Sequence, residues 1–151
     1  MTSPGPRLLA AVALTLPLGC TAITVQPVDA SVQLDRVCIE KNTEVEVEDF
    51  LGAVREGFRR HGVETEVFLG APFAPCEFVL KYSATRSWDL EYYLSHAELH
   101  LERSGQPLAS AVYHLRLGGG YALTKYQSTK TKMDPVVDEL LAGQGAKSPQ
   151  P

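Results

Sequence analysis

Alternation of apolar and polar residues between positions 78 and 116 is the feature that most limits the possible folds. Three segments, 78–85, 93–102 and 107–116, place apolar side chains on every second position and polar ones between them. A period of two puts one set of side chains on each face of a β-strand. The pattern predicts a three-strand meander with one buried face. The apolar set comprises Phe78, Leu80, Tyr82, Ala84, Tyr93, Ala97, Leu99, Leu101, Ala109, Ala111, Tyr113 and Leu115.

A tight turn joins the last two of these segments. Residues 103–105 fit a three-residue hairpin loop with Gly in the left-handed position. That loop predicts Leu99 opposite Ala109 and Ala97 opposite Ala111. A slip by one residue would turn the apolar set towards solvent, so the pattern fixes which face is buried.

A strand and a helix are predicted before the meander, followed by another strand. Residues 32–40 and 63–69 have the β-branched alternation of short strands. Between them, apolar residues recur at helical spacing from Val47 to Phe58, after a Thr43-x-x-Glu46 capping box and before a C-terminal Gly62.

A second helix is predicted over residues 124–142. Asp134-Pro135 should kink or restart it, because proline cannot donate the intrahelical hydrogen bond. Together these elements predict an α+β domain in the order β-α-β-β-β-β-α. We expect a mostly antiparallel sheet of about five strands with two helices packed on one face.

The first 19 residues have the form of a bacterial lipoprotein signal peptide. Arg7 is followed by an apolar run too short to span a bilayer and then by Leu-Gly-Cys20. Cys20 is the expected first mature residue, carrying the lipid; the alternative is an ordinary secretory peptide that happens to contain a cysteine. Thr21 is typical of lipoproteins sent to the outer membrane. We therefore expect an outer-membrane lipoprotein facing the periplasm, held to the membrane by lipid on Cys20.

Cleavage before Cys20 divides the chain into four parts. A signal peptide (1–19) precedes a lipidated tether (20–31), one periplasmic α+β domain (32–142) and a polar tail (143–151) that we expect to be disordered. Only Arg7 among the charged residues lies in the signal, so the mature chain keeps 13 basic and 18 acidic residues, a formal charge of −5. This balance disfavours nonspecific binding to nucleic acid.

Two cysteines remain after lipidation of Cys20. Cys38 and Cys76 would face an oxidising envelope, where we expect them to form a disulfide. A metal site is the alternative, but no CxxC motif or adjacent histidine supplies further ligands.

The best sequence candidate for a contact surface is the segment of residues 86–93. It holds Trp88, the only tryptophan, together with Tyr92 and Tyr93. Exposed aromatic side chains are common at protein interfaces, although a tryptophan more often covers one end of a sheet.

Catalytic and metal motifs are weak in this sequence. The serines lack a GxSxG elbow, and Gly118 to Gly120 lack the spacing of a phosphate-binding loop. His96, Glu98 and His114 are expected on the solvated face of the meander, with His114 diagonal to His96, and are the only candidate metal ligands. We expect no enzyme activity and no cofactor.

Several segments resemble a small family of Gram-negative envelope lipoproteins of the Sbal type. The resemblance covers nearly all of the mature chain and implies a lipoprotein without assigned activity, so it supplies no catalytic residues. It lies in Cys20-Thr21-Ala22-Ile23, Val37-Cys38-Ile39-Glu40, Asp49-Phe50-Leu51, Gly57-Phe58-Arg59-Arg60-His61-Gly62, Arg86-Ser87-Trp88-Asp89, residues 93–99 and residues 132–141.

These observations favour function by binding. We expect a protein-binding accessory module of an envelope complex, with an envelope protein as partner. The alternative is a lipoprotein that binds a small ligand or a metal through the face around His96, Glu98 and His114.

Overall fold

The computed structural model describes residues 21–119 and 123–144. The predicted signal peptide, Cys20 and residues 145–151 lie outside the described part. Gln144, predicted to belong to a disordered tail, is held by the fold: its side-chain amide donates to the carbonyl oxygen of Val32 at 2.7 Å and accepts from the amide of Leu34 at 3.1 Å.

The fold is α+β, as predicted, but its sheet is mixed and has six strands. The spatial strand order is β1-β6-β5-β4-β2-β3. Along the chain the elements are β1 (Thr21–Gln26), β2 (Arg36–Glu40), α1 (Phe50–Arg60), β3 (Glu64–Phe68), β4 (Phe78–Asp89), β5 (Glu91–Arg103), β6 (Gln106–Leu115), the 3-10 helices η1 (Arg116–Gly119) and η2 (Leu123–Tyr126), and α2 (Thr129–Leu140).

The mixed character arises at β2, which runs parallel to both β3 and β4. A helix that connects two adjacent strands returns the chain to its starting end, so the second strand runs parallel to the first. α1 is that connection between β2 and β3. The strand alternation predicted both strands but did not reveal this direction.

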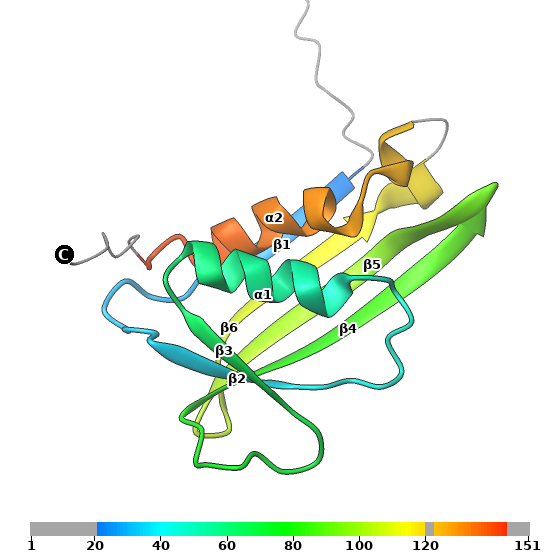
Figure 1. Cartoon of the computed structure of the whole chain (residues 1–151). Helices are drawn as coiled ribbons and strands as arrows, with labels where there is room; N and C mark the ends of the chain where they lie inside the picture. The colour runs from blue at the N-terminus through cyan, green and yellow to red at the C-terminus, as the bar shows by residue number, and fades with distance from the viewer. Residues whose placement is uncertain (1–20, 120–122, 145–151) are drawn as a thin grey trace, which may run out of the picture.

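Both helices cover one face of the sheet and enclose the core (Figure 1). Gly57 of α1 meets α2 so closely that an added Cβ would lie 2.6 Å from the side chain of Val137. A residue larger than glycine at position 57 would therefore push the helices apart. At the rim, Arg60 of α1 forms ion pairs of 2.8 Å with Asp134 and with Asp138 of α2.

The meander is present, with a register two residues away from the predicted one. Leu99 pairs with Ala111 and Ala97 pairs with Tyr113, because the turn consists of two residues, Ser104 and Gly105, and the ladder shifts once more between Leu101 and Glu102. An even shift leaves each side chain on its predicted face. The buried set was therefore correct although the partners were not.

β1 replaces the first half of the predicted tether. Thr21–Gln26 pairs antiparallel with β6, with Thr21 opposite Leu115 and Gln26 opposite Ser110. The apolar Ile23 and Val25 pack against the core from this edge. Val25 and Ile23 carry the period-two signal that the tether interpretation overlooked.

The two helix boundaries also differ from prediction. α1 begins at Phe50 after Asp49 in a left-handed conformation (φ 55°), so Thr43 and Glu46 do not form a capping box. α2 continues through Pro135 without restarting, because Ser128 caps it seven residues earlier by accepting a hydrogen bond from the amide of Thr131 at 3.1 Å.

The predicted disulfide joins Cys38 of β2 to Cys76, with Cα atoms 6.1 Å apart. Cys76 belongs to the loop between β3 and β4, residues 69–77, hereafter the β3–β4 loop. The disulfide links this loop to β2, which lies between β4 and β3 in the sheet.

Replacing Cys38 and Cys76 together with alanine should lower the free energy of unfolding by about 3 to 4 kcal/mol, because the bridge closes a loop across 38 residues. Denaturant unfolding measures the loss. Reducing the unsubstituted protein should reproduce it, whereas Cys20→Ser should not. Equal stability of the double variant would show that the bridge does not constrain the unfolded chain.

Candidate functional site

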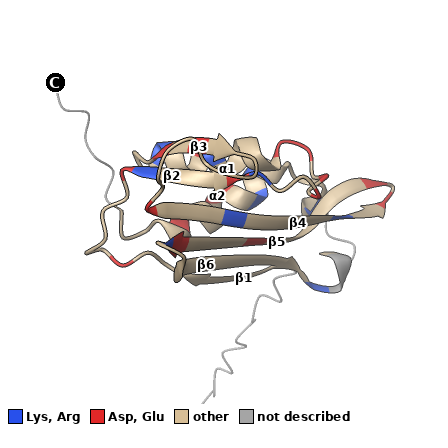
Figure 2. Cartoon of the chain, turned by 90° about the horizontal axis from the view of Figure 1, so that it is seen from below, with Lys and Arg blue, Asp and Glu red and all other residues tan. Residues whose placement is uncertain are grey.

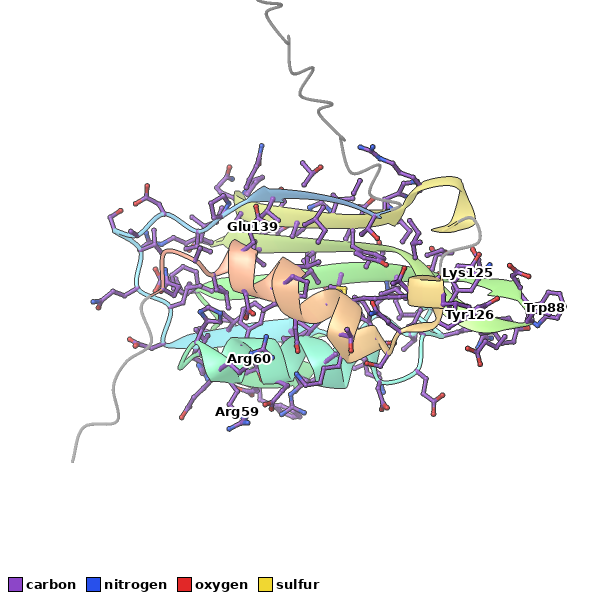
Figure 3. All side chains as sticks on the ribbon, turned by 90° about the horizontal axis from the view of Figure 1, so that it is seen from above. Arg59, Arg60, Trp88, Lys125, Tyr126 and Glu139 are labelled. Carbon is purple, nitrogen blue, oxygen red and sulfur yellow. A yellow bond between two sulfur atoms is a disulfide. The ribbon has the colours of Figure 1, made fainter. Side chains whose placement is uncertain are left out.

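The segment predicted as an aromatic loop is a rigid hairpin, hereafter the arm (residues 86–94). β4 and β5 stay paired as far as Asp89 and Glu91, and Leu90 makes the reversal with φ 65°. Trp88 is 67% exposed, Leu90 83% and Tyr92 62%. Figure 3 shows Trp88 at the extremity of the molecule, beyond the part of the sheet covered by helices.

Asp89 fastens the arm to the segment before α2. Its carboxylate pairs with Lys125, and its carbonyl oxygen accepts a hydrogen bond of 2.6 Å from the hydroxyl of Tyr126. The hydrogen bond to Asp89 raises the pKa of Lys125, so this lysine stays charged. Sequence reasoning missed the contact because 36 residues separate the partners.

A second ion pair supports the arm from the other side. Arg86 donates to Glu46 at 2.6 Å, and its guanidinium carbon lies 4.3 Å from the ring centroid of Tyr92. Such stacking holds the tyrosine ring in place. The charged groups at the base of the arm are thus paired with each other, and Trp88 and Tyr92 remain exposed to solvent.

Tyr93 is buried, as its place in the alternating apolar set predicted, although the sequence also offered it as a contact candidate beside Trp88 and Tyr92. It is only 8% exposed and packs edge-on against Tyr126, with ring centroids 6.0 Å apart. Its ring also faces Lys132 of α2, whose amino group lies 5.5 Å from the centroid. Tyr93 therefore joins the arm to the core and is unavailable as a contact residue.

Lys132 is a buried lysine of the core. Its amino group donates to the carbonyl oxygen of Leu94 at 3.1 Å and to that of Lys125. Burial lowers the pKa of Lys132 to about 8. The lysine connects α2, η2 and the base of the arm, and nothing in the helical spacing distinguishes it from a surface lysine.

A second exposed apolar patch lies at the opposite end of β4. In the β3–β4 loop, Phe73 is 94% exposed, and Leu69 is also largely exposed. Arg36 donates to the carbonyl oxygen of Pro75 at 3.2 Å, and Cys76 is covalently bound to Cys38. The end of the loop that carries Cys76 is thus held to β2, and Phe73 lies three residues before it. The proline- and alanine-rich sequence predicted a loop but not this exposure.

The histidine face of the sheet contains the three predicted candidate ligands and one more. His114 lies directly opposite His96, not diagonally, and the rings meet edge-on with centroids 5.5 Å apart. The carboxylate of Glu98 is hydrogen-bonded to His96 at 2.9 Å and to His100 at 3.0 Å. These hydrogen bonds lower the pKa of Glu98, and the one with His100 has the larger effect. Within residues 21–119 and 123–144, no group of three or more His, Cys, Asp or Glu side chains is arranged to hold a metal ion.

Figure 2 shows basic and acidic residues interspersed along the strands, and neither sign dominates a large region of the part drawn in colour. None of the helices within the described ranges is both long and apolar enough to span a bilayer. Among all described side chains, the large exposed apolar ones fall at the arm, at the β3–β4 loop, and at Leu123 of η2.

Comparison with known proteins supports the fold and nothing finer. No protein-family model matches the chain. No curated protein matches it in sequence. Two solved structures of the PelC dodecamer from Paraburkholderia phytofirmans, one of them a single-substitution variant, are similar in fold. Each is 12% identical over 85% of this chain and 99% of the PelC chain, with TM-scores of 0.56 for the variant and 0.55 for the other.

Lys132 should give the protein an unusual alkaline stability profile. Between pH 8 and 10.5 the folded form holds this lysine neutral, while the unfolded chain still binds the proton, because the ordinary pKa is 10.5. Stability rises with pH wherever the unfolded state binds more protons. Denaturant unfolding between pH 8 and 10.5 measures how the free energy of unfolding changes with pH. That free energy should rise less with pH in Lys132→Met than in the unsubstituted protein.

The exposed Lys130, on the same helix, provides the control. Lys130→Met removes an equal charge from the exposed side of the helix, so comparison with it separates the loss of a charge from the loss of the buried amino group. Identical slopes for Lys132→Met and the unsubstituted protein would show that Lys132 titrates alike in the folded and unfolded states.

Proposed function

We propose that the protein is a lipoprotein of the outer membrane, anchored by lipid on Cys20, that acts in the periplasm as a protein-binding module. The lipobox at Leu18-Gly19-Cys20 and the resemblance to Sbal-type lipoproteins support the anchor. The Cys38–Cys76 bridge supports an oxidising compartment, since disulfides persist there and are rare in the cytosol.

The observation that carries the binding role is Phe73 on its tethered loop. Phe73 is 94% exposed, and Leu69 of the same loop is also largely exposed, so the loop offers apolar surface that a partner could cover. The disulfide and the Arg36–Pro75 hydrogen bond limit the conformations of the loop before binding. Less ordering entropy is then lost on association, which is the advantage of a preorganised contact.

The position of the loop also suits a partner in the periplasm. β4 has 12 residues and leads from the β3–β4 loop to the arm, so about 40 Å separates the two patches. Thr21, the first residue of β1, lies at the arm end of the sheet, because it pairs with Leu115 at the end of β6. The loop therefore faces away from the lipid anchor, towards the components of the envelope.

The PelC structures add one partner to be considered. PelC of this fold assembles as a dodecamer, so a second copy of the present chain is one protein that the loop may be tested against. At 12% identity the likeness carries no information on which surface would be used.

A photo-crosslinking residue placed at position 73 tests the proposal in intact cells. The lipidated protein should capture one envelope protein, or a second copy, reproducibly, and the same residue at the exposed Glu139 on α2 should not. With the captured protein purified, Phe73→Ser should weaken binding by about tenfold to a hundredfold, because loss of a central aromatic contact costs about 2 kcal/mol or more. Identical adducts from both positions would contradict a specific contact at the loop.

A further inference from the structure

The direction of the strands places the arm beside the chain end that emerges from Cys20. β1, β6 and β5 are successively antiparallel, so the first residue of β1 lies at the same end of the sheet as the last of β6 and the first of β5. That end of β5 is the arm. In Figure 1 the start of β1 and the tip of the β4–β5 hairpin accordingly lie on the same side of the molecule.

No spacer separates the anchor from the sheet. β1 begins at Thr21, immediately after Cys20, and Thr21 pairs with Leu115, one residue past the His96–His114 pair. Thr21 is thus level with Ser95, and Leu90 lies five residues farther out, about 17 Å along the strand. Two strand spacings add about 10 Å sideways, so the arm tip stays within about 20 Å of Thr21.

A reach of about 20 Å is greater than the depth of the headgroup region, so the arm tip meets that region when the strands lie oblique to the membrane. The headgroup region adds only about 5 to 8 Å to each side of the hydrocarbon core. Acyl chains on Cys20 would hold the first residue at that level. The arm, which extends beyond Thr21, is then the part of this end that reaches lipid first.

The side chains of the arm have the chemistry of a membrane interface. Tryptophan and tyrosine are enriched at the headgroup level, where their rings are apolar and their N–H and O–H groups are hydrated. Trp88 and Tyr92 flank Leu90 at the tip, and the exposed Leu123 belongs to η2, which the Asp89 contacts hold against the arm.

Two of the three charged side chains within the arm near its tip are paired. Asp89 is paired with Lys125, and Arg86 is paired with Glu46, so each carries its counter-charge with it. Glu91 is the exposed acid beside the turn. The contact would therefore depend on apolar insertion and only weakly on anionic lipid or salt.

We propose that the arm inserts Trp88, Leu90 and Tyr92 into the headgroup region of the membrane that holds the Cys20 lipid. This inference rests on the proposed anchor, and it assigns the arm to lipid and the β3–β4 loop to protein. Two attachments, the acyl chains and the arm, fix how the domain stands on the membrane, and the Phe73 patch then faces the periplasm.

Fluorescence of Trp88 tests the inference directly, because it is the only tryptophan in the chain. The lipidated protein is reconstituted into vesicles of phosphatidylethanolamine and phosphatidylglycerol, with and without bromine on the acyl chains. Trp88 emission should move to shorter wavelength on reconstitution and be quenched by the brominated lipid. Leu90→Ser should reduce the quenching, and Phe73→Ser should leave it unchanged.

Three other results would each contradict a different part of the account. Unquenched Trp88 in protein whose mass shows the acyl chains would overturn the arm contact while leaving the anchor intact. A protein without acyl chains would overturn the anchor itself. Emission that shifts with protein concentration in the absence of vesicles would assign the arm to a second copy of the chain and overturn contact with lipid.

Discussion

The long antiparallel pairing of β4 with β5 is the interaction on which the rest of the structure depends. It extends from Phe78 opposite Arg103 to Asp89 opposite Glu91 and is the most extensive ladder in the described sheet. The longer part of the ladder, from Phe78 to Thr85, contributes buried side chains to the core. The shorter part, from Arg86 to Asp89, extends beyond the helices as the arm.

The same ladder determines how far apart the two apolar patches lie. Phe73 precedes the first residues of β4, and Trp88 is near its last, so a single strand separates them. The disulfide restrains the loop at one end, and the Asp89 contacts with Lys125 and Tyr126 restrain the arm at the other. In the proposed function, this strand sets the distance between the membrane and the partner.

Sequence alone predicted faces well and neighbours poorly. Alternation identified nearly every buried residue of the meander, because the side-chain period of a strand is a local property. It could not set the Leu99–Ala111 pairing, which depends on a two-residue turn and a bulge, nor the parallel direction of β2, which depends on where α1 returns the chain. The tether interpretation overlooked β1 because Thr21–Gln26 is short and adjoins the signal.

The candidate site shows the same division. The sequence left open whether Trp88 would be exposed or would cover one end of the sheet, and in the structure Trp88 and Tyr92 are exposed. Tyr93 was predicted both as part of the buried set and as a contact candidate; it is buried, against Tyr126 and Lys132, which are distant in sequence. Phe73 was overlooked because exposure of a loop residue has no periodic signature. The cysteine pair was predictable because compartment and cysteine count left few alternatives.

Mass spectrometry of the membrane-extracted protein tests the central claim most directly, which is that lipid on Cys20 joins the membrane to the first strand without a spacer. Trypsin should release a first peptide of residues 20–36, since Arg36 is the first basic residue after Cys20. The account predicts that this peptide carries acyl chains on Cys20. A first peptide that begins elsewhere, or one with an unmodified Cys20 thiol, would contradict it.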